Sequence, residues 1–164
     1  MPEPVLTGGC QCGAVRYALN TWPERAHICH CRMCQKAFGA YFAAFAAFAG
    51  VPRDKFELTR GDLATFMSSD QAERGFCRDC GTPLTFRYVG RVRIAFSLGS
   101  LDHPERVKPE QQIGVESRVP WFSEICALPG DMTTEEDEPE TAAAIAKSNH
   151  QHPDHDTTEW PPKA

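Results

Sequence analysis

Three short cysteine clusters constrain this sequence more than any other feature. Seven of its eight cysteines lie in the segments GGCQCG at 8–13, CHCRMC at 29–34 and CRDCG at 77–81. Pairs spaced C-x-C or C-x-x-C place two thiolates about one metal ion apart, and zinc takes four such ligands tetrahedrally. Gly13 and Gly81 directly follow their pairs, where a metal-binding turn needs unusual backbone angles. We therefore expect these cysteines to hold zinc rather than form disulfides.

Seven thiolates do not divide into two sets of four. One partition joins the first and third clusters into a closed site and leaves the middle cluster as a three-thiolate site with an open position, which is typical of a catalytic zinc. A rival partition pairs Cys31 and Cys34 with the third cluster as a zinc ribbon. His27 or His30 could also complete the middle site and make both sites structural. The spacing alone leaves these alternatives open.

Alternating apolar residues predict strands over most of the first hundred residues. In 15–19 and 92–98, apolar residues occupy every second position, which puts one face on a core and the other towards water. The other predicted strands are 41–49, 56–58, 64–67, 73–76 and 82–89. A short helix is expected at 32–38, ended by Gly39. The pattern as a whole indicates a mainly β protein.

Composition divides the chain at residue 130. Residues 131–164 carry nine acidic and two basic side chains, a balance of -7, whereas residues 1–130 carry 13 and 15, a balance of +2. We expect 1–130 to form a zinc-binding domain and 131–164 to be an acidic, flexible tail with a short helix at 141–149. In this tail we interpret His150, His152 and His155 as solvated side chains rather than metal ligands. Cys126, between apolar neighbours, is expected to be a buried, inert thiol.

Charge and hydropathy also bear on location and partners. A body of charge +2 lacks the basic surface of a nucleic-acid-binding protein. No apolar run approaches the ~20 residues of a membrane span. The N-terminus shows neither a basic start nor an apolar signal core. We therefore expect a cytoplasmic protein with no nucleic-acid or membrane partner, and we leave a homo-oligomer open.

Several motifs recur in an order and spacing that resemble a known family. They are GGCQCGAVRY at 8–17, CHCRMC at 29–34, ERGFCRDCGTPL at 73–84, SLGSLD at 97–102 and SRVPW at 117–121. Over about residues 5–125 the chain resembles the glutathione-dependent formaldehyde-activating enzyme family, which shares its domain with centromere protein V. The chain departs from many of these relatives at 112–114, where Gln-Ile-Gly stands in place of a His-Ile-Trp-like segment.

The resemblance implies a fold, two metal ions and an activity. The fold is mainly β, with small folded-over antiparallel sheets around two zinc sites and one short helix. The resemblance also selects the first partition, with one structural and one catalytic Zn²⁺. The implied structural ligands are Cys10, Cys12, Cys77 and Cys80, and the implied catalytic ligands are Cys29, Cys31 and Cys34. The implied enzyme is a carbon–sulfur lyase, S-(hydroxymethyl)glutathione synthase-like, that joins a small thiol such as glutathione to a small aldehyde such as formaldehyde.

The residue types suit that chemistry better than hydrolysis. Three thiolates on Zn²⁺ leave a formal charge of -1, so such an ion is a poor Lewis acid for water but keeps a thiolate nucleophilic. Arg32 and Lys36 could balance charge or meet a carboxylate, although surface cations are common. The only H-x-E, at 103–105, precedes no cysteine pair, which excludes a zinc deaminase. The alternatives are a non-catalytic zinc-binding module with an interaction or chaperone role, and a family member with another thiol substrate.

Overall fold

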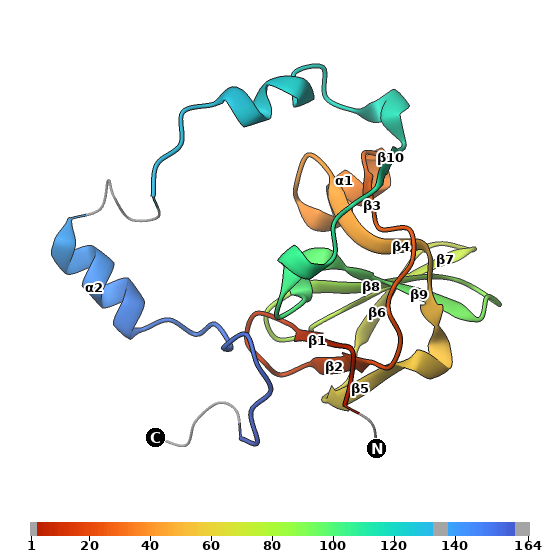
Figure 1. Cartoon of the computed structure of the whole chain (residues 1–164), viewed down its shortest axis with the longest axis horizontal. Coiled ribbons are helices and arrows are strands. Elements are labelled where there is room, and N and C mark those ends of the chain that lie inside the picture. Colours follow the sequence, from red (N-terminus) through yellow and green to blue (C-terminus); the bar gives the residue numbers. More distant parts are fainter. Residues whose placement is uncertain (1–2, 133–137, 160–164) are drawn as a thin grey trace.

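Two β-sheets form the body of the molecule (Figure 1). This computed structural model describes residues 3–132 and 138–159, and in these ranges the smaller sheet has the order β1-β2-β5 and the larger β10-β3-β4-β9-β8-β7-β6. All neighbours pair antiparallel except β10 and β3, which are parallel. The strands are β1 (Leu6–Gly9), β2 (Arg16–Leu19), β3 (His27–Cys29), β4 (Ala43–Pro52), β5 (Phe56–Arg60), β6 (Ala64–Ser69), β7 (Ala72–Phe76), β8 (Pro83–Tyr88), β9 (Arg93–Ser97) and β10 (Gln111–Ile113).

Helices are short and few among the described residues. The α-helices are α1 (Arg32–Phe38) and α2 (Pro139–Lys147), and the 3-10 turns are η1 (Arg53–Lys55), η2 (Leu98–Ser100), η3 (Pro104–Arg106), η4 (Val115–Ser117) and η5 (Phe122–Ala127). Helix α1 has the predicted limits because Gly39 adopts a left-handed φ of 60° and ends it. None of these helices is long and apolar enough to cross a bilayer. The mainly β fold class predicted from the sequence is confirmed.

Strand β9 separates the main core from a second, smaller apolar cluster. Ile94 and Phe96 belong to the main core, together with Tyr17 and Leu84. Ala95, between them in sequence, points to the opposite face and joins the cluster that contains Cys29 and Cys34. The expectation that one face of this strand meets water is therefore wrong, because both faces are covered from Ile94 to Ser97.

Strand β2 departs from its predicted alternation for an electrostatic reason. Arg16 should face water in a half-exposed strand, yet it is only 3% exposed. Its guanidinium donates two hydrogen bonds to the Asp102 carboxylate, at 2.7 and 2.6 Å, and Thr7 Oγ1 donates a third at 2.5 Å. A buried charge is tolerated when it is paired and hydrogen-bonded in this way. The pair fixes β2 against the loop that follows η2.

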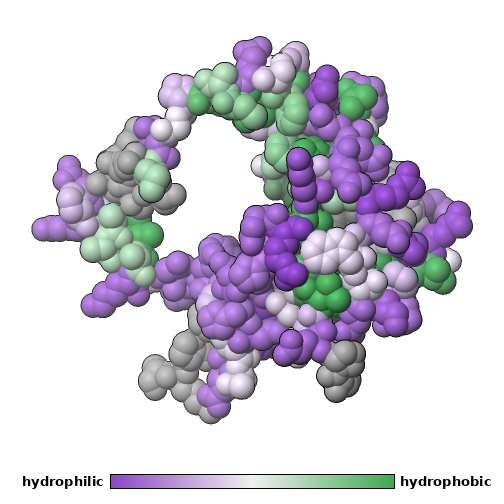
Figure 2. Space-filling view, viewed as in Figure 1, coloured by the Kyte–Doolittle hydropathy of each residue, from purple (hydrophilic) through white to green (hydrophobic). Residues whose placement is uncertain are grey.

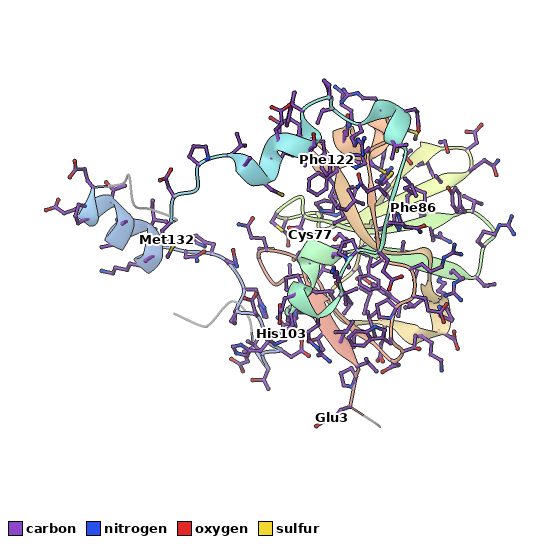
Figure 3. All side chains as sticks on the ribbon, turned by 45° about the horizontal axis from the view of Figure 1, so that its top comes forward. Glu3, Cys77, Phe86, His103, Phe122 and Met132 are labelled. Carbon is purple, nitrogen blue, oxygen red and sulfur yellow. The ribbon has the colours of Figure 1, made fainter. Side chains whose placement is uncertain are left out.

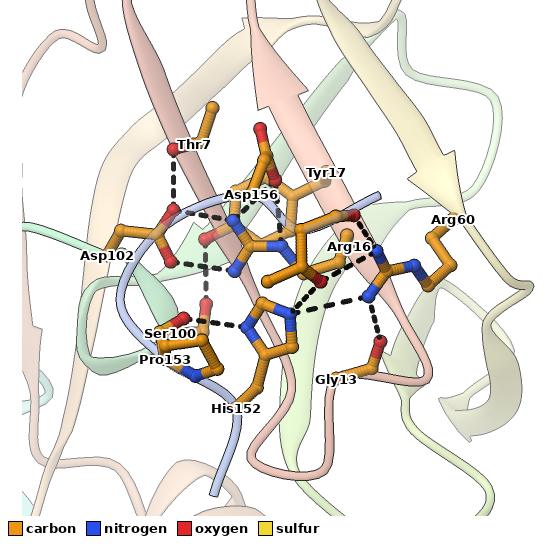
Figure 4. Close-up of polar contacts among 11 residues, drawn as sticks. Thr7, Gly13, Arg16, Tyr17, Arg60, Ser100, Asp102, His152, Pro153 and Asp156 are labelled. Atoms are coloured by element: carbon orange, nitrogen blue, oxygen red, sulfur yellow. Dashed lines mark hydrogen bonds and ion pairs between the residues drawn. The ribbon is translucent and has the colours of Figure 1, made fainter. Parts of the chain in front are cut away.

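Residues 151–157, here called the C-terminal strap, lie against the body (Figure 4). Asp156 accepts from Arg16 at 2.6 Å, and Arg60 donates to the backbone carbonyl and hydroxyl of Thr157. His152 is 4% exposed, and its backbone N–H donates to the Gln11 carbonyl at 2.7 Å. The space-filling view shows mainly hydrophilic residues where the strap meets the body (Figure 2). Polar contacts rather than apolar area hold this segment.

The strap corrects part of the expectation for residues 131–164. His152 is not a solvated side chain, since its ring contacts the Pro153 carbonyl through Nδ1 at 2.7 Å and Thr157 Oγ1 through Nε2 at 3.1 Å. His150 and His155 are exposed, as expected. Helix α2 has no buried residue and overlaps the predicted 141–149. Residues 133–137 and 160–164 of the predicted tail lie outside the described residues, and the division of the chain at residue 130 stays a prediction.

The expectation of a buried thiol at Cys126, which precedes the strap in sequence, is also wrong. Cys126 lies in η5 and is exposed, not buried among apolar residues. Phe122, at the start of η5, packs against His30 and Phe42. Beyond η5 the chain leaves the body, and Met132 lies far from the labelled Cys77 and Phe86 (Figure 3). Apolar neighbours in sequence do not bury a thiol where the chain leaves the surface of the body.

The strap contacts predict that Asp156→Asn destabilises the protein. Loss of one charge in contact with buried Arg16 should lower the free energy of unfolding by about 1 kcal/mol, which corresponds to roughly 2–4 °C in Tm. Ending the chain at residue 150 should lower Tm further. Asp154→Asn is the matched control, because Asp154 lies in the same segment, is exposed and makes no ion pair in the described structure. Equal melting temperatures for Asp156→Asn and the control would contradict the prediction.

Candidate metal centres

Four cysteines from two turns far apart in sequence converge at one end of the sheets. Cys10 and Cys12 follow β1, and Cys77 and Cys80 lie between β7 and β8. Their four sulfurs all lie within 4.8 Å of one another. The sulfur of Cys12 is 3.6 Å from that of Cys10 and 3.8 Å from that of Cys77. A ZnS₄ tetrahedron with bonds of ~2.3 Å has edges of about 3.8 Å, so the spacing fits a zinc ion.

The backbone of each turn is shaped for its sulfurs. Gly13 and Gly81 have φ of 74° and 76°, a region that side-chain-bearing residues seldom adopt. Each glycine N–H donates to the carbonyl of the first cysteine in its pair, at 3.1 and 3.0 Å. The backbone N–H of Val15 donates to the Cys10 sulfur at 3.2 Å. This geometry agrees with the expectation from the sequence that the two glycines adopt the backbone angles of a metal-binding turn.

Thr82 adds a polar contact to the four-cysteine cluster. Its hydroxyl lies 3.1 Å from the Cys80 sulfur and also accepts from the Gln11 backbone N–H at 3.1 Å. Burial acts to raise the pKa of Cys80, but hydrogen bonds from Thr82 and Cys12 outweigh it and lower that pKa to about 6. Burial raises the pKa of Cys10. A metal ion that binds this cluster would displace protons from the cysteines whose pKa is raised.

The second cluster is built from one short turn. Cys29 ends β3, Cys31 is the N-cap of α1, and Cys34 lies in the first turn of that helix. Their three sulfurs also lie within 4.8 Å of one another. The Cys31 sulfur accepts from the Cys34 backbone N–H at 3.4 Å, so it caps the helix while facing its neighbours. The structure thus brings all seven predicted site cysteines together as four and three, and it does not place Cys31 and Cys34 with the third pair.

Neither neighbouring histidine completes the three-cysteine cluster. Among the described residues, no histidine or carboxylate joins these sulfurs within the same distance. His30 is fully buried on the other side of the turn, where its Nε2 donates to Gln112 Oε1 at 2.9 Å and its ring packs edge-on against Phe122. His27 lines the cavity next to the sulfurs without joining their group. A metal held by these three thiolates would retain an open coordination position.

The parallel pair β10–β3 positions this turn. Ile113 is in register with Cys29, and the His30 backbone N–H donates to the Ile113 carbonyl at 2.9 Å. Gly114 follows with a φ of 64°, and a Cβ there would lie 2.7 Å from the Cys31 backbone nitrogen. The Gln-Ile-Gly departure at 112–114 is therefore coupled to the turn, because any larger residue at 114 would displace Cys31.

A cavity of ≈ 380 Å³ opens beside the three sulfurs. Its walls are largely apolar and come from β3, α1, β6, β7, β8, β9 and β10. Ala95 contributes a small side chain to the lining, which leaves room that a larger residue at this position of β9 would fill. The lining residues are His27, Cys29, Cys31, Met33, Cys34, Ser69, Ala72, Arg74, Phe86, Tyr88, Ala95, Ile113 and Gly114.

Arg74 of β7 is the residue at this site that the sequence analysis did not single out. It is 9% exposed, and its Nη2 donates to the Cys34 sulfur at 3.5 Å. Its guanidinium also lies 5.1 Å from the centre of the Phe86 ring. The sequence signal that could have identified it is its position in ERGFCRDC, three residues before a predicted metal ligand. Alternation in β7 turns Arg74 inward, whereas Glu73 pairs with Arg87 on the other face.

The three sulfurs have unequal proton affinities because they share hydrogen bonds. The Cys29 thiol lowers the pKa of Cys34 to about 5, and the Arg74 guanidinium adds to this effect against the opposing effect of burial. The same contact with Cys34, together with burial, raises the pKa of Cys29. The turn is thus able to hold a thiolate at Cys34 near neutral pH before any metal binds.

The two cations proposed near this turn have different surroundings. Arg32 and Lys36 are both exposed on α1, and both line a larger cavity of ≈ 670 Å³ next to the first one. Arg32 donates to the Gln35 side-chain oxygen at 2.6 Å. Gln35, in turn, is buried and donates to the His30 and Ser117 carbonyls. Met33 and Arg74 line both cavities and so lie between them.

Comparison with known proteins places this architecture in a family. A solved structure of a Rhodobacter sphaeroides protein is similar to this chain at 23% sequence identity, with a TM-score of 0.48, over 65% of this chain and 99% of that one. The family model described as glutathione-dependent formaldehyde-activating enzyme matches residues 5–117, which contain every cysteine of both clusters. The chain therefore belongs to the glutathione-dependent formaldehyde-activating enzyme family.

Proposed function

We propose that this protein is a zinc-dependent carbon–sulfur lyase or synthase that acts on a small, glutathione-like thiol and an aldehyde such as formaldehyde. The observation that carries the proposal is the three-cysteine cluster, which lacks a fourth described ligand and faces a cavity. In this proposal Cys10, Cys12, Cys77 and Cys80 hold a structural zinc, and Cys29, Cys31 and Cys34 hold a catalytic one. Family membership supports the choice of substrates.

The donor sets suit these two roles. Four thiolates complete the coordination of zinc and leave no position for a substrate, whereas three leave one. Zinc bound by three thiolates would hold a small thiol as its thiolate beside the cavity and would activate water poorly. The cluster of four also joins two turns 65 residues apart, from Cys12 to Cys77, so its metal would contribute directly to folding.

The chain's own residues would position the reactants. The largely apolar cavity walls, including Phe86 and Ile113, would limit the access of water to the sulfurs. Arg74 lies next to the negative charge of the cluster and offsets it. A thiolate sulfur at this position would attack the aldehyde carbon, so that the C–S bond forms as the carbonyl π bond breaks. The oxygen would take the electron pair of that π bond and then a proton from water. Cleavage of the adduct is the same step in reverse. Positioning of two reactants in one cavity is the main source of acceleration.

The metal assignment predicts different outcomes for two cysteine variants. Wild-type protein, purified reduced, should contain two zinc ions per chain by metal analysis. Cys77→Ser should contain less zinc and melt at least about 10 °C lower or not fold, because a structural zinc supplies a large part of the folding energy. Cys31→Ser should keep its fold with about one zinc. Cys126→Ser is the matched control, since Cys126 is exposed and outside both clusters. Equal loss of stability in Cys77→Ser and Cys31→Ser would indicate two structural sites.

The proposed reaction predicts an acceleration of hemithioacetal exchange. With glutathione and formaldehyde, the zinc-loaded protein should raise the exchange rate measured by NMR at least about tenfold above a sample without protein. Cys31→Ser should lose this acceleration and Cys126→Ser should keep it. Calorimetry in two buffers of different ionisation enthalpy should show release of about one proton per thiol bound. Absence of both thiol binding and acceleration, with two zinc ions present, would favour a non-catalytic zinc-binding module.

A further inference from the structure

Arg74 has fewer partners than its burial requires. A guanidinium has five N–H donors, and burial of such a charge is costly unless it is paired. In the described structure its polar contact is with the Cys34 sulfur, and its Nε is buried without a hydrogen-bond acceptor. The nearby Phe86 ring offsets only part of the cost. Glu73, the adjacent carboxylate in sequence, is already bound by Arg87.

On the side of the larger cavity, the surroundings of Arg74 are positively charged. The ≈ 670 Å³ cavity beside it has Arg32 and Lys36 on the α1 side, and Phe66 and Pro83 on the strand side. No acidic residue is among the described residues that line this cavity or the smaller one. Three cations line this concave, partly apolar region, and the cysteine turn next to Arg74 is the one negative group among the described residues that line the two cavities. The larger cavity, which has no carboxylate among those residues, therefore favours an anionic ligand. The volume is in the range of pockets for small organic ligands.

We propose that Arg74 is the residue that recognises a carboxylate on the thiol substrate, with Arg32 and Lys36 as a second, outer pair of cations. The proposal rests on the proposed function for the place of the sulfur, which is beside Cys34. The two cavities meet at Arg74 and Met33, so a thiol with its sulfur at the cysteines can extend its anionic part into the larger cavity. Arginine suits this role because its planar fork matches a carboxylate. The substrate class is then a carboxylate-bearing thiol rather than a neutral or cationic one.

A purely positional role for Arg74 makes a different prediction. If Arg74 only held the Cys34 sulfur, its loss would weaken charged and uncharged ligands to the same extent. If it binds a carboxylate, its loss matters only for ligands that carry one. The two roles are separated by a cycle that combines substitution of Arg74 with removal of the ligand carboxylates, and that measures whether the two effects on affinity are additive.

The experiment measures equilibrium binding to zinc-loaded, full-length protein by calorimetry, without formaldehyde. The probes are S-methylglutathione, which keeps both carboxylates but has no ionisable thiol, and its diethyl ester, which has neither carboxylate. The proteins are wild type, Arg74→Met, Arg74→Lys and the control Arg91→Met. Methionine keeps an apolar stem against Phe86, and lysine keeps the charge but not the fork. Arg91 is exposed and lines neither cavity. Zinc content is measured for every sample.

The proposal expects wild type and Arg91→Met to bind S-methylglutathione at least about tenfold more tightly than the diethyl ester. Arg74→Met should remove most of this preference, and Arg74→Lys should show an intermediate one. Equal weakening of both probes by Arg74→Met, or a wild type that does not distinguish acid from ester, would overturn the proposal. If Arg74→Met does not fold, the proposal is tested by the preference of the wild type for S-methylglutathione over the diethyl ester and by the reduction of that preference in Arg74→Lys.

The same probes separate this inference from the proposed function. S-methylglutathione has no thiol to transfer, so its binding does not depend on the reaction. Arg74-dependent binding of S-methylglutathione without acceleration of hemithioacetal exchange would contradict the proposed function and would still support a carboxylate-binding site at Arg74. Acceleration with glutathione and its diethyl ester alike, without a preference for the acid, would keep the chemistry and remove the role of Arg74.

Discussion

The convergence of four sulfurs from two turns is the constraint on which the rest of the molecule depends. The turns follow β1 and β7, in different sheets, and the sulfurs lie within 4.8 Å of one another. Four sulfurs at that distance could hold one metal ion, which would then tie the two sheets together at this joint. Strand β7 leaves this joint in a fixed direction, and Arg74, three residues before Cys77, points to the second cluster from it. The position of the three-cysteine cavity thus depends on the first cluster.

Much of this arrangement can be predicted from the sequence, because its signals are local. The turns at Gly13 and Gly81, the helix ended by Gly39 and seven of the strands follow from spacing and alternation. Strands β1, β3 and β10 were not predicted. They have three or four residues each, so they contain too few positions to show a period. Two of them, β3 and β10, form the parallel pair that holds the three-cysteine turn.

Apart from Cys126, the residues that the sequence analysis misjudged or overlooked are mainly buried charges and their partners. Arg16 and Arg74 occupy strand positions that a polar side chain normally gives to solvent, and each is at least nine-tenths buried. What decides their burial is an acceptor from a distant segment, namely Asp102 for Arg16 and the Cys34 sulfur for Arg74. Local periodicity contains no information about such partners. The partition of the seven cysteines is undecided by spacing for the same reason, since the geometry that separates four from three arises only in the folded chain.

The two buried arginines differ in a way that bears on function. Arg16 has two carboxylates, one from the body and one from the strap, and its charge is fully matched within the chain. Arg74 has a sulfur and an aromatic ring, and its match is incomplete. A protein that needed Arg74 only for stability would gain by supplying a carboxylate, as it does for Arg16, or by replacing the arginine with an apolar residue. An incompletely matched cation between the three-cysteine turn and a cavity is better explained by a charge that arrives with the ligand.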